Sequence, residues 1–234
     1  MSTRNNFEAP PRDLNQDTPQ PATPMSFAAP TEFVDLPSKG KFYGANHPLQ
    51  GLESVEIKYM TAKEEDILTS KALLKKNLVI DRFLNSILID KRINPSDLLI
   101  TDKNAIIIAA RITGYGAQYT TGVKCPSCLA QNRINIDLSS VLESGLTEIE
   151  VDDEDAILTD KGTYIVTTPR TEAKVEFKLL NGHDEKNIAK ALEMRRKNNL
   201  PESLTTTTMA SFIVSVNGSE DPMYIGSFIE NAPA

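Results

Sequence analysis

Two cysteines in "GVKCPSCLAQN", residues 122–132, are the side chains best suited to chemistry. Cys125 and Cys128 are the only cysteines of the chain and are separated by two residues. Thiolates at this spacing form one knuckle of a zinc ribbon, in which turn amides help to hold the sulfur atoms. The same spacing also occurs in redox dithiols and in hairpin tips that bind nothing.

A closed structural zinc site needs four ligands, and this pair supplies two. His47 and His183, the two histidines of the chain, complete the set only if the fold brings them close. A thioredoxin-like dithiol normally opens a helix after a strand, whereas both flanks here alternate like strands. Three interpretations therefore stay open: a tip without a ligand, a redox pair, and a zinc half-site at Cys125 and Cys128 that distant residues or another chain complete.

The rest of the sequence contains no pattern typical of an active site. Nucleophilic catalysis needs a base beside the nucleophile, but His47 lies in a proline-flanked turn and His183 at an expected helix start. There is no HExxH, phosphate-binding glycine loop or paired-carboxylate signature. A glycine motif that binds a dinucleotide opens a helix, and residues 114–116 (Gly-Tyr-Gly) are not followed by a helix start. We predict no catalytic residue, no cofactor-binding residue and no enzymatic activity.

Composition narrows the class of protein. The chain has 234 residues, and its net charge of −7 argues against nucleic-acid binding, which needs a basic surface. No apolar run approaches the roughly 18 residues that span a membrane. The polar, proline-rich N-terminus does not resemble a secretory signal. Together with the two cysteines, this predicts synthesis in a reducing, intracellular environment.

The pattern of elements predicts an α+β fold. Residues 1–32 form a proline-rich arm that we expect to be disordered until a partner binds it. Residues 33–116 hold a turn-rich segment, a strand near 54–60 and a helical subdomain at about 61–114. Thr61 and Glu64 match a capping box, and Asp102 is expected to cap an apolar helix over 103–113.

Antiparallel β-hairpins and further helices follow this subdomain. Residues 117–140 predict the cysteine-tipped β-hairpin, and residues 141–234 an α+β C-terminal part. That part contains an acidic connector at 143–155, a second strand pair, a helix from about 184 to 197, and helical spacing from Met209 to Val216. We expect one shared core that contains Ile80, Leu84, Ile87, Ile107 and Ile108.

Several segments, taken in order, carry a family resemblance. The most specific are "MTAKEEDIL", "DLLITDKNA" and "ARITGYG", and "DLPSKGKFY", the CPSC hairpin and "SVNGSEDPMYIGSFIE" agree more loosely. Over residues 33–230, the chain resembles the baseplate hub and baseplate assembly proteins of T-even-like contractile-tailed bacteriophages.

The resemblance implies a non-enzymatic structural or assembly role in the tail baseplate, through contacts with other baseplate and tail proteins or with itself. It implies a protein made and assembled in the bacterial host cytoplasm and located in the virion. Two alternatives remain. One is a chaperone that helps the hub to assemble and then leaves. The other is a zinc-ribbon-like nucleic-acid or transcription accessory protein, against which the acidic composition argues.

Overall fold

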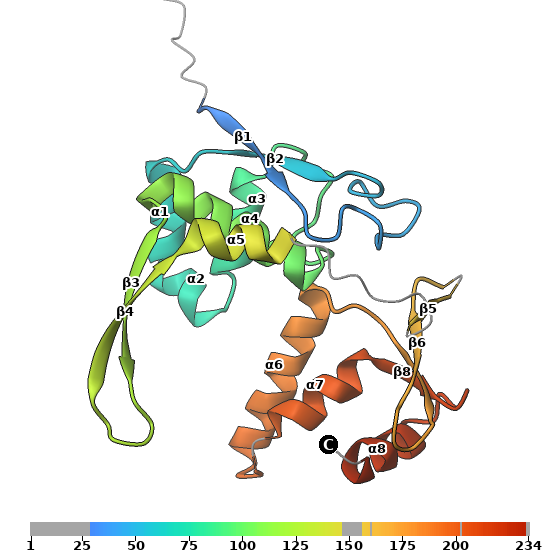
Figure 1. The fold of residues 1–234 in the computed structure, drawn as a ribbon. Coiled ribbons are helices and arrows are strands. Elements are labelled where there is room, and N and C mark those ends of the chain that lie inside the picture. Colours follow the sequence, from blue (N-terminus) through green and yellow to red (C-terminus); the bar gives the residue numbers. More distant parts are fainter. Residues whose placement is uncertain (1–28, 147–155, 160, 202, 233–234) are drawn as a thin grey trace, which may run out of the picture.

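The computed structural model describes residues 29–146, 156–159, 161–201 and 203–232 (Figure 1). Its mixture of helices and antiparallel strand pairs confirms the α+β prediction. Most of the predicted arm, residues 1–28, lies outside the described residues. Residues 31 and 32, which the sequence assigned to the arm, belong to the first strand.

An N-terminal module packs a two-stranded sheet against four helices. β1 pairs antiparallel with β2, so that Val34 lies opposite Val55 and both are buried. The elements are β1 (Thr31–Asp35), β2 (Ser54–Lys58), α1 (Ala62–Thr69), α2 (Lys71–Lys75), α3 (Val79–Ile87) and α4 (Ile100–Tyr115).

The remaining elements form a hairpin, a connecting helix and a C-terminal module. The C-terminal sheet has the order β5-β6-β7-β8 and is antiparallel throughout. The elements are β3 (Gln118–Lys124), β4 (Gln131–Asp137), α5 (Leu138–Leu146), β5 (Ile157–Leu158), β6 (Tyr164–Thr167), β7 (Lys174–Phe177), α6 (Gly182–Lys197), α7 (Leu204–Phe212), β8 (Ile213–Val216) and α8 (Pro222–Asn231).

The core of the N-terminal module confirms the apolar stripe of α3 only in part. Leu84 and Ile87 have no exposed surface. Ile80 is 38% exposed, so its predicted burial is wrong. On α4 the best-buried large residue is Ile106, whereas Ile107 and Ile108 are half-buried. An uninterrupted apolar run therefore does not place this helix at the centre of a core, because α3 and the β1–β2 sheet bury mainly one of its faces.

Glu64 shows why the first helix begins where it does. The predicted capping box is confirmed: the carboxylate accepts from the Thr61 amide at 2.9 Å and the Thr61 hydroxyl at 2.6 Å. Lys58 donates at 2.7 Å, and Ser86 of α3 donates as well. Burial alone would raise the pKa of Glu64, but these hydrogen bonds outweigh burial and lower the pKa to about 2. One carboxylate thus ties β2, α1 and α3 together.

Asp102 has a different role from the one its sequence position suggested. The residue that precedes α4 is Leu99, and Asp102 lies inside the first turn with no exposed surface. Its carboxylate accepts from the Ser38 amide at 2.9 Å, the Ser38 hydroxyl at 2.5 Å and the Tyr43 hydroxyl at 2.7 Å. The prediction of a cap at Asp102 is therefore wrong. Instead, Asp102 anchors the turn-rich segment after β1 on the N-terminus of α4, where the helix dipole favours a negative charge.

The C-terminal module also departs from the sequence prediction. The helix expected to continue to Val216 ends at Phe212, and Ile213–Val216 form strand β8. β8 pairs with β7, and the Ser215 hydroxyl donates to Glu176 at 3.0 Å. Helical spacing misled here because β-branched residues can satisfy the same pattern in a short strand. Of the predicted acidic connector, residues 143–146 belong to α5, and residues 147–155 lie outside the described part of the chain.

Candidate functional site

The two cysteines lie at the tip of the β3–β4 hairpin. The strands pair in register from Gln118 opposite Asp137 to Lys124 opposite Gln131, which confirms the predicted hairpin. The Cys125 amide donates to Ala130 at 2.9 Å, and the Leu129 amide donates to the Cys125 carbonyl at 2.9 Å. Both cysteines therefore occupy a tight turn between two strands, and neither opens a helix.

The turn places hydrogen-bond donors around one sulfur atom. Both thiols are free; Cys128 is exposed and Cys125 is half-buried. The backbone amides of Cys128 and Ser127, and the Cys128 side chain, form hydrogen bonds that lower the pKa of Cys125. Amides directed at a sulfur are also what a metal-binding knuckle uses to hold its thiolates. Leu129 completes the turn with a left-handed φ of 62°.

The fold does not bring the histidines to the cysteines. The His47 ring stacks on Tyr43 with centroids 4.3 Å apart, and its Nδ1 accepts from the Leu49 amide at 3.1 Å. His183 lies at the start of α6, where its Nε2 is 2.9 Å from Asp97. Among the described residues, no group of three or more His, Cys, Asp or Glu side chains is arranged to hold a metal ion. The cysteine pair is thus at most half of a site within this part of one chain.

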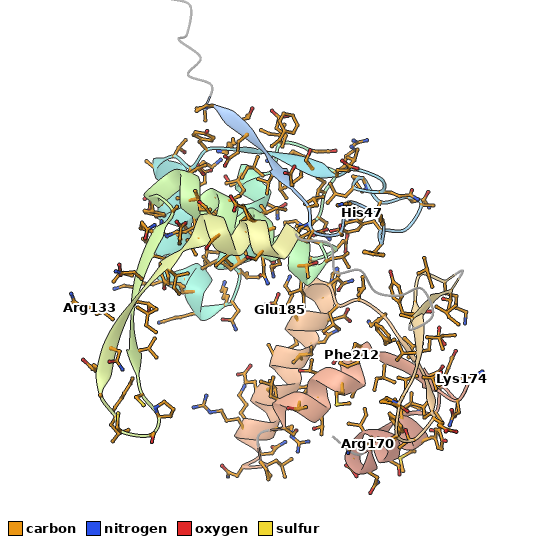
Figure 2. The ribbon with its side chains drawn as sticks, in the orientation of Figure 1. His47, Arg133, Arg170, Lys174, Glu185 and Phe212 are labelled. Atoms are coloured by element: carbon orange, nitrogen blue, oxygen red, sulfur yellow. The ribbon has the colours of Figure 1, made fainter. Side chains whose placement is uncertain are left out.

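The two faces of the hairpin differ in polarity, since one gathers the apolar side chains, with Thr121 and Asn132 among them, and the other is polar. Tyr119, Val123 and Ile134 share a face with Ile136, and the first three are each more than 40% exposed. The opposite face carries Gln, Thr, Lys, Arg and Asn side chains, among them Arg133, which Figure 2 shows on the outer side of the hairpin. The hairpin projects away from the rest of the described chain (Figure 1). Sequence alternation alone could have revealed this apolar face.

A second feature that sequence reasoning missed is the junction between the two modules. The Gly182 amide donates to the Leu98 carbonyl at 3.1 Å and the His183 amide to the Ser96 carbonyl at 3.0 Å. Lys103 of α4 pairs with Glu185 of α6 at 2.5 Å, and Figure 2 shows Glu185 where α6 meets the N-terminal module. A Cβ on Gly182 would lie 3.0 Å from the Ser96 carbonyl oxygen, so this close approach suits glycine.

The C-terminal helices enclose an open groove with a volume of about 610 Å³. Residues of α6, α7 and α8 line it, and Met194 and Leu200 are 60% and 50% exposed. Its lining contains little that could do chemistry, because most of the side chains are apolar, hydroxyl or amide groups. Large exposed apolar side chains around a groove are typical of a surface that contacts other proteins.

These observations describe a molecule with surfaces for contact. None of the described helices is both long enough and apolar enough to cross a lipid bilayer. No nucleophile lies beside a histidine in the contacts given above: His47 meets an aromatic ring and an amide, and His183 meets a carboxylate. The exposed hairpin and the C-terminal groove remain as the candidate sites for contact with other proteins.

Comparison with known proteins identifies the family. The family model of the T4 bacteriophage base plate protein matches residues 29–162, which is more than half of the 234 residues. The matched range runs from β1 through the N-terminal module, the cysteine-tipped hairpin and α5 to the turn before β6. No curated protein and no solved structure matches the chain. Because this family model matches more than half of the chain, the chain belongs to the T4 bacteriophage base plate protein family.

Proposed function

We propose that this protein is a non-enzymatic component of the baseplate hub, that it stays in the virion, and that it acts only through contacts with other proteins. Membership of the base plate family carries the proposal, since it supports a structural or assembly role in a phage baseplate. It follows that the chain is made and assembled in the cytoplasm of the bacterial host, with other tail proteins as partners.

The described surface supports a role in contact. The groove between α6, α7 and α8 presents Met194 and Leu200 to solvent. The junction at Gly182, together with the pair of Lys103 and Glu185, holds α6 against the N-terminal module. A groove fixed to the family-matched module in this way suits a neighbouring baseplate protein as its occupant, because burial of exposed apolar side chains drives association.

Two kinds of variant separate contact from catalysis in a phage that lacks its own copy of the gene. Met194→Asp is expected to reduce the yield of infectious particles at least about tenfold, because a charge in a buried contact costs more than about 1.4 kcal/mol. The matched control is Ala189→Asp, which adds the same charge to an exposed position of α6 outside the groove lining. We expect this control to leave the yield unchanged.

The histidine variants test whether the protein catalyses a reaction. His47→Asn keeps an acceptor near the Leu49 amide, and His183→Gln keeps a donor near Asp97. Both should support normal plaque formation, since neither ring is required for chemistry. If either variant folds normally but fails to complement, the non-enzymatic assignment is wrong. If Met194→Asp complements fully, the groove is not the contact surface.

A further inference from the structure

We propose that two copies of the chain share one zinc ion, held by Cys125 and Cys128 at the tips of their β3–β4 hairpins. This goes beyond a structural role in the baseplate, because it names a metal site and the partner that completes it. Three features of the molecule support this site: the geometry of the tip, the apolar face of the hairpin and the charges beside the cysteines.

The tip already has the form of half a structural zinc site. Two cysteines separated by two residues occupy a tight turn between paired strands, with the turn closed by the hydrogen bond from Leu129 to Cys125. The amides of Ser127 and Cys128 form hydrogen bonds with Cys125. Zinc in a structural site is bound by four ligands in a tetrahedron, and thiolate pairs at this spacing supply two of them.

The remaining two ligands must come from elsewhere. Among the residues that the structure describes, no third His, Cys, Asp or Glu is grouped with the cysteines. His47 contacts Tyr43 and the Leu49 amide, and His183 contacts Asp97. The projection of the hairpin leaves its tip accessible to a second molecule (Figure 1).

The apolar face of the hairpin favours a second copy as that molecule. An isolated two-stranded hairpin is marginally stable in water, yet Tyr119, Val123 and Ile134 are all exposed along one face. A two-fold axis places identical patches against each other, so one apolar face covers another. The same axis brings two further thiolates to the tip. One symmetry operation thus satisfies both the uncovered face and the incomplete metal site.

The charges near the tip are compatible with a zinc ion that is bound by four thiolates. Zinc with four thiolates carries a net charge of −2. Lys124 precedes the first cysteine, and the sequence has no Asp or Glu between Gln118 and Ile136. In a dimer, two lysines therefore lie next to the cysteines that hold the negative cluster. Nearby cations of this kind stabilise thiolate ligands.

The test is zinc titration of the full-length chain, purified with a phosphine reductant and stripped of metal. Light scattering after gel filtration should show monomer without zinc and dimer with zinc, at one zinc per two chains. We expect zinc to lower the dimer dissociation constant at least about 100-fold, and excess chelator should reverse this. Cobalt substituted for zinc should give the sulfur-to-metal charge-transfer bands of a tetrahedral site with four thiolates.

A double Cys125→Ser and Cys128→Ser variant should lose both metal binding and zinc-dependent dimerisation while its circular dichroism stays unchanged. Ser127→Ala changes the same turn without removing a sulfur and should keep both. One tightly bound zinc per monomer, no zinc uptake by the reduced chain, or a dimer that zinc does not affect would each overturn the proposal. Since the assay uses only the purified chain, its failure leaves the proposed baseplate role to be judged separately.

Discussion

Replacing Asp102 with alanine is expected to reduce the free energy of unfolding by about 3–5 kcal/mol. The Asp102 carboxylate has no exposed surface and accepts hydrogen bonds from the Ser38 amide and from the hydroxyls of Ser38 and Tyr43. Alanine would leave these buried donors without their acceptor, and each such donor costs about 1–3 kcal/mol. The Tyr43 hydroxyl also accepts from the Leu99 amide at 3.2 Å, so the loss would extend to the start of α4.

Urea unfolding followed by circular dichroism at 222 nm measures this effect, since the chain has no tryptophan. Asp66→Ala makes the same chemical change at an exposed position of α1 and should cost less than about 0.5 kcal/mol. Equal stability losses for the two variants would show that Asp102 does not anchor the segment after β1.

Leu84→Ala is expected to cost about 2–5 kcal/mol, because it creates a cavity in the centre of the N-terminal core. Leu84 has no exposed surface and packs in one cluster with Ile87, Ile106 and the buried residues of β1 and β2. Urea unfolding followed by circular dichroism at 222 nm measures this loss of stability as well.

The matched control is Leu74→Ala on α2, where the leucine is 52% exposed. That substitution should cost less than about 1 kcal/mol, since most of the side chain is already in water. A loss below about 0.5 kcal/mol for Leu84→Ala would mean that α3 does not bury this side chain.

Local signals in the sequence were sufficient to predict several elements. The capping box of Thr61 and Glu64, the start of α6 near Asp184 and the hairpin around the cysteines all depend on residues a few positions apart. Hydrogen bonds of this range form in the same way in many folds. The sequence did not predict that Glu64 also binds Ser86, a contact that depends on how α1 packs against α3.

Interactions between distant segments account for the wrong predictions. Asp102 has the sequence appearance of a helix cap, but the partners of its side chain lie 59 and 64 residues earlier in the chain. Ile213 and Val216 fit a helical period, but pairing with β7 makes them part of a strand. In both cases tertiary contacts outweigh local preference, which is small per residue.

The sequence was sufficient to predict which residues of the candidate site could bind a metal ion, but not which further ligands could complete the site. Spacing alone singled out Cys125 and Cys128 and placed them at a hairpin tip. Whether His47 or His183 could join them depended on the fold, which places both histidines among other partners. The groove of the C-terminal helices has no sequence signature, because its lining comes from three helices that only the fold brings together.

Quantitative mass spectrometry of purified phage particles shows whether the protein is retained in the baseplate as a structural component. Particles banded twice in a density gradient should contain peptides of this chain at a constant ratio to the other tail proteins. A matched sample of infected cells gives the total amount produced. Abundant protein in the cells but none in the particles would contradict a structural role in the virion and identify the protein as an assembly factor that leaves before the virion is complete.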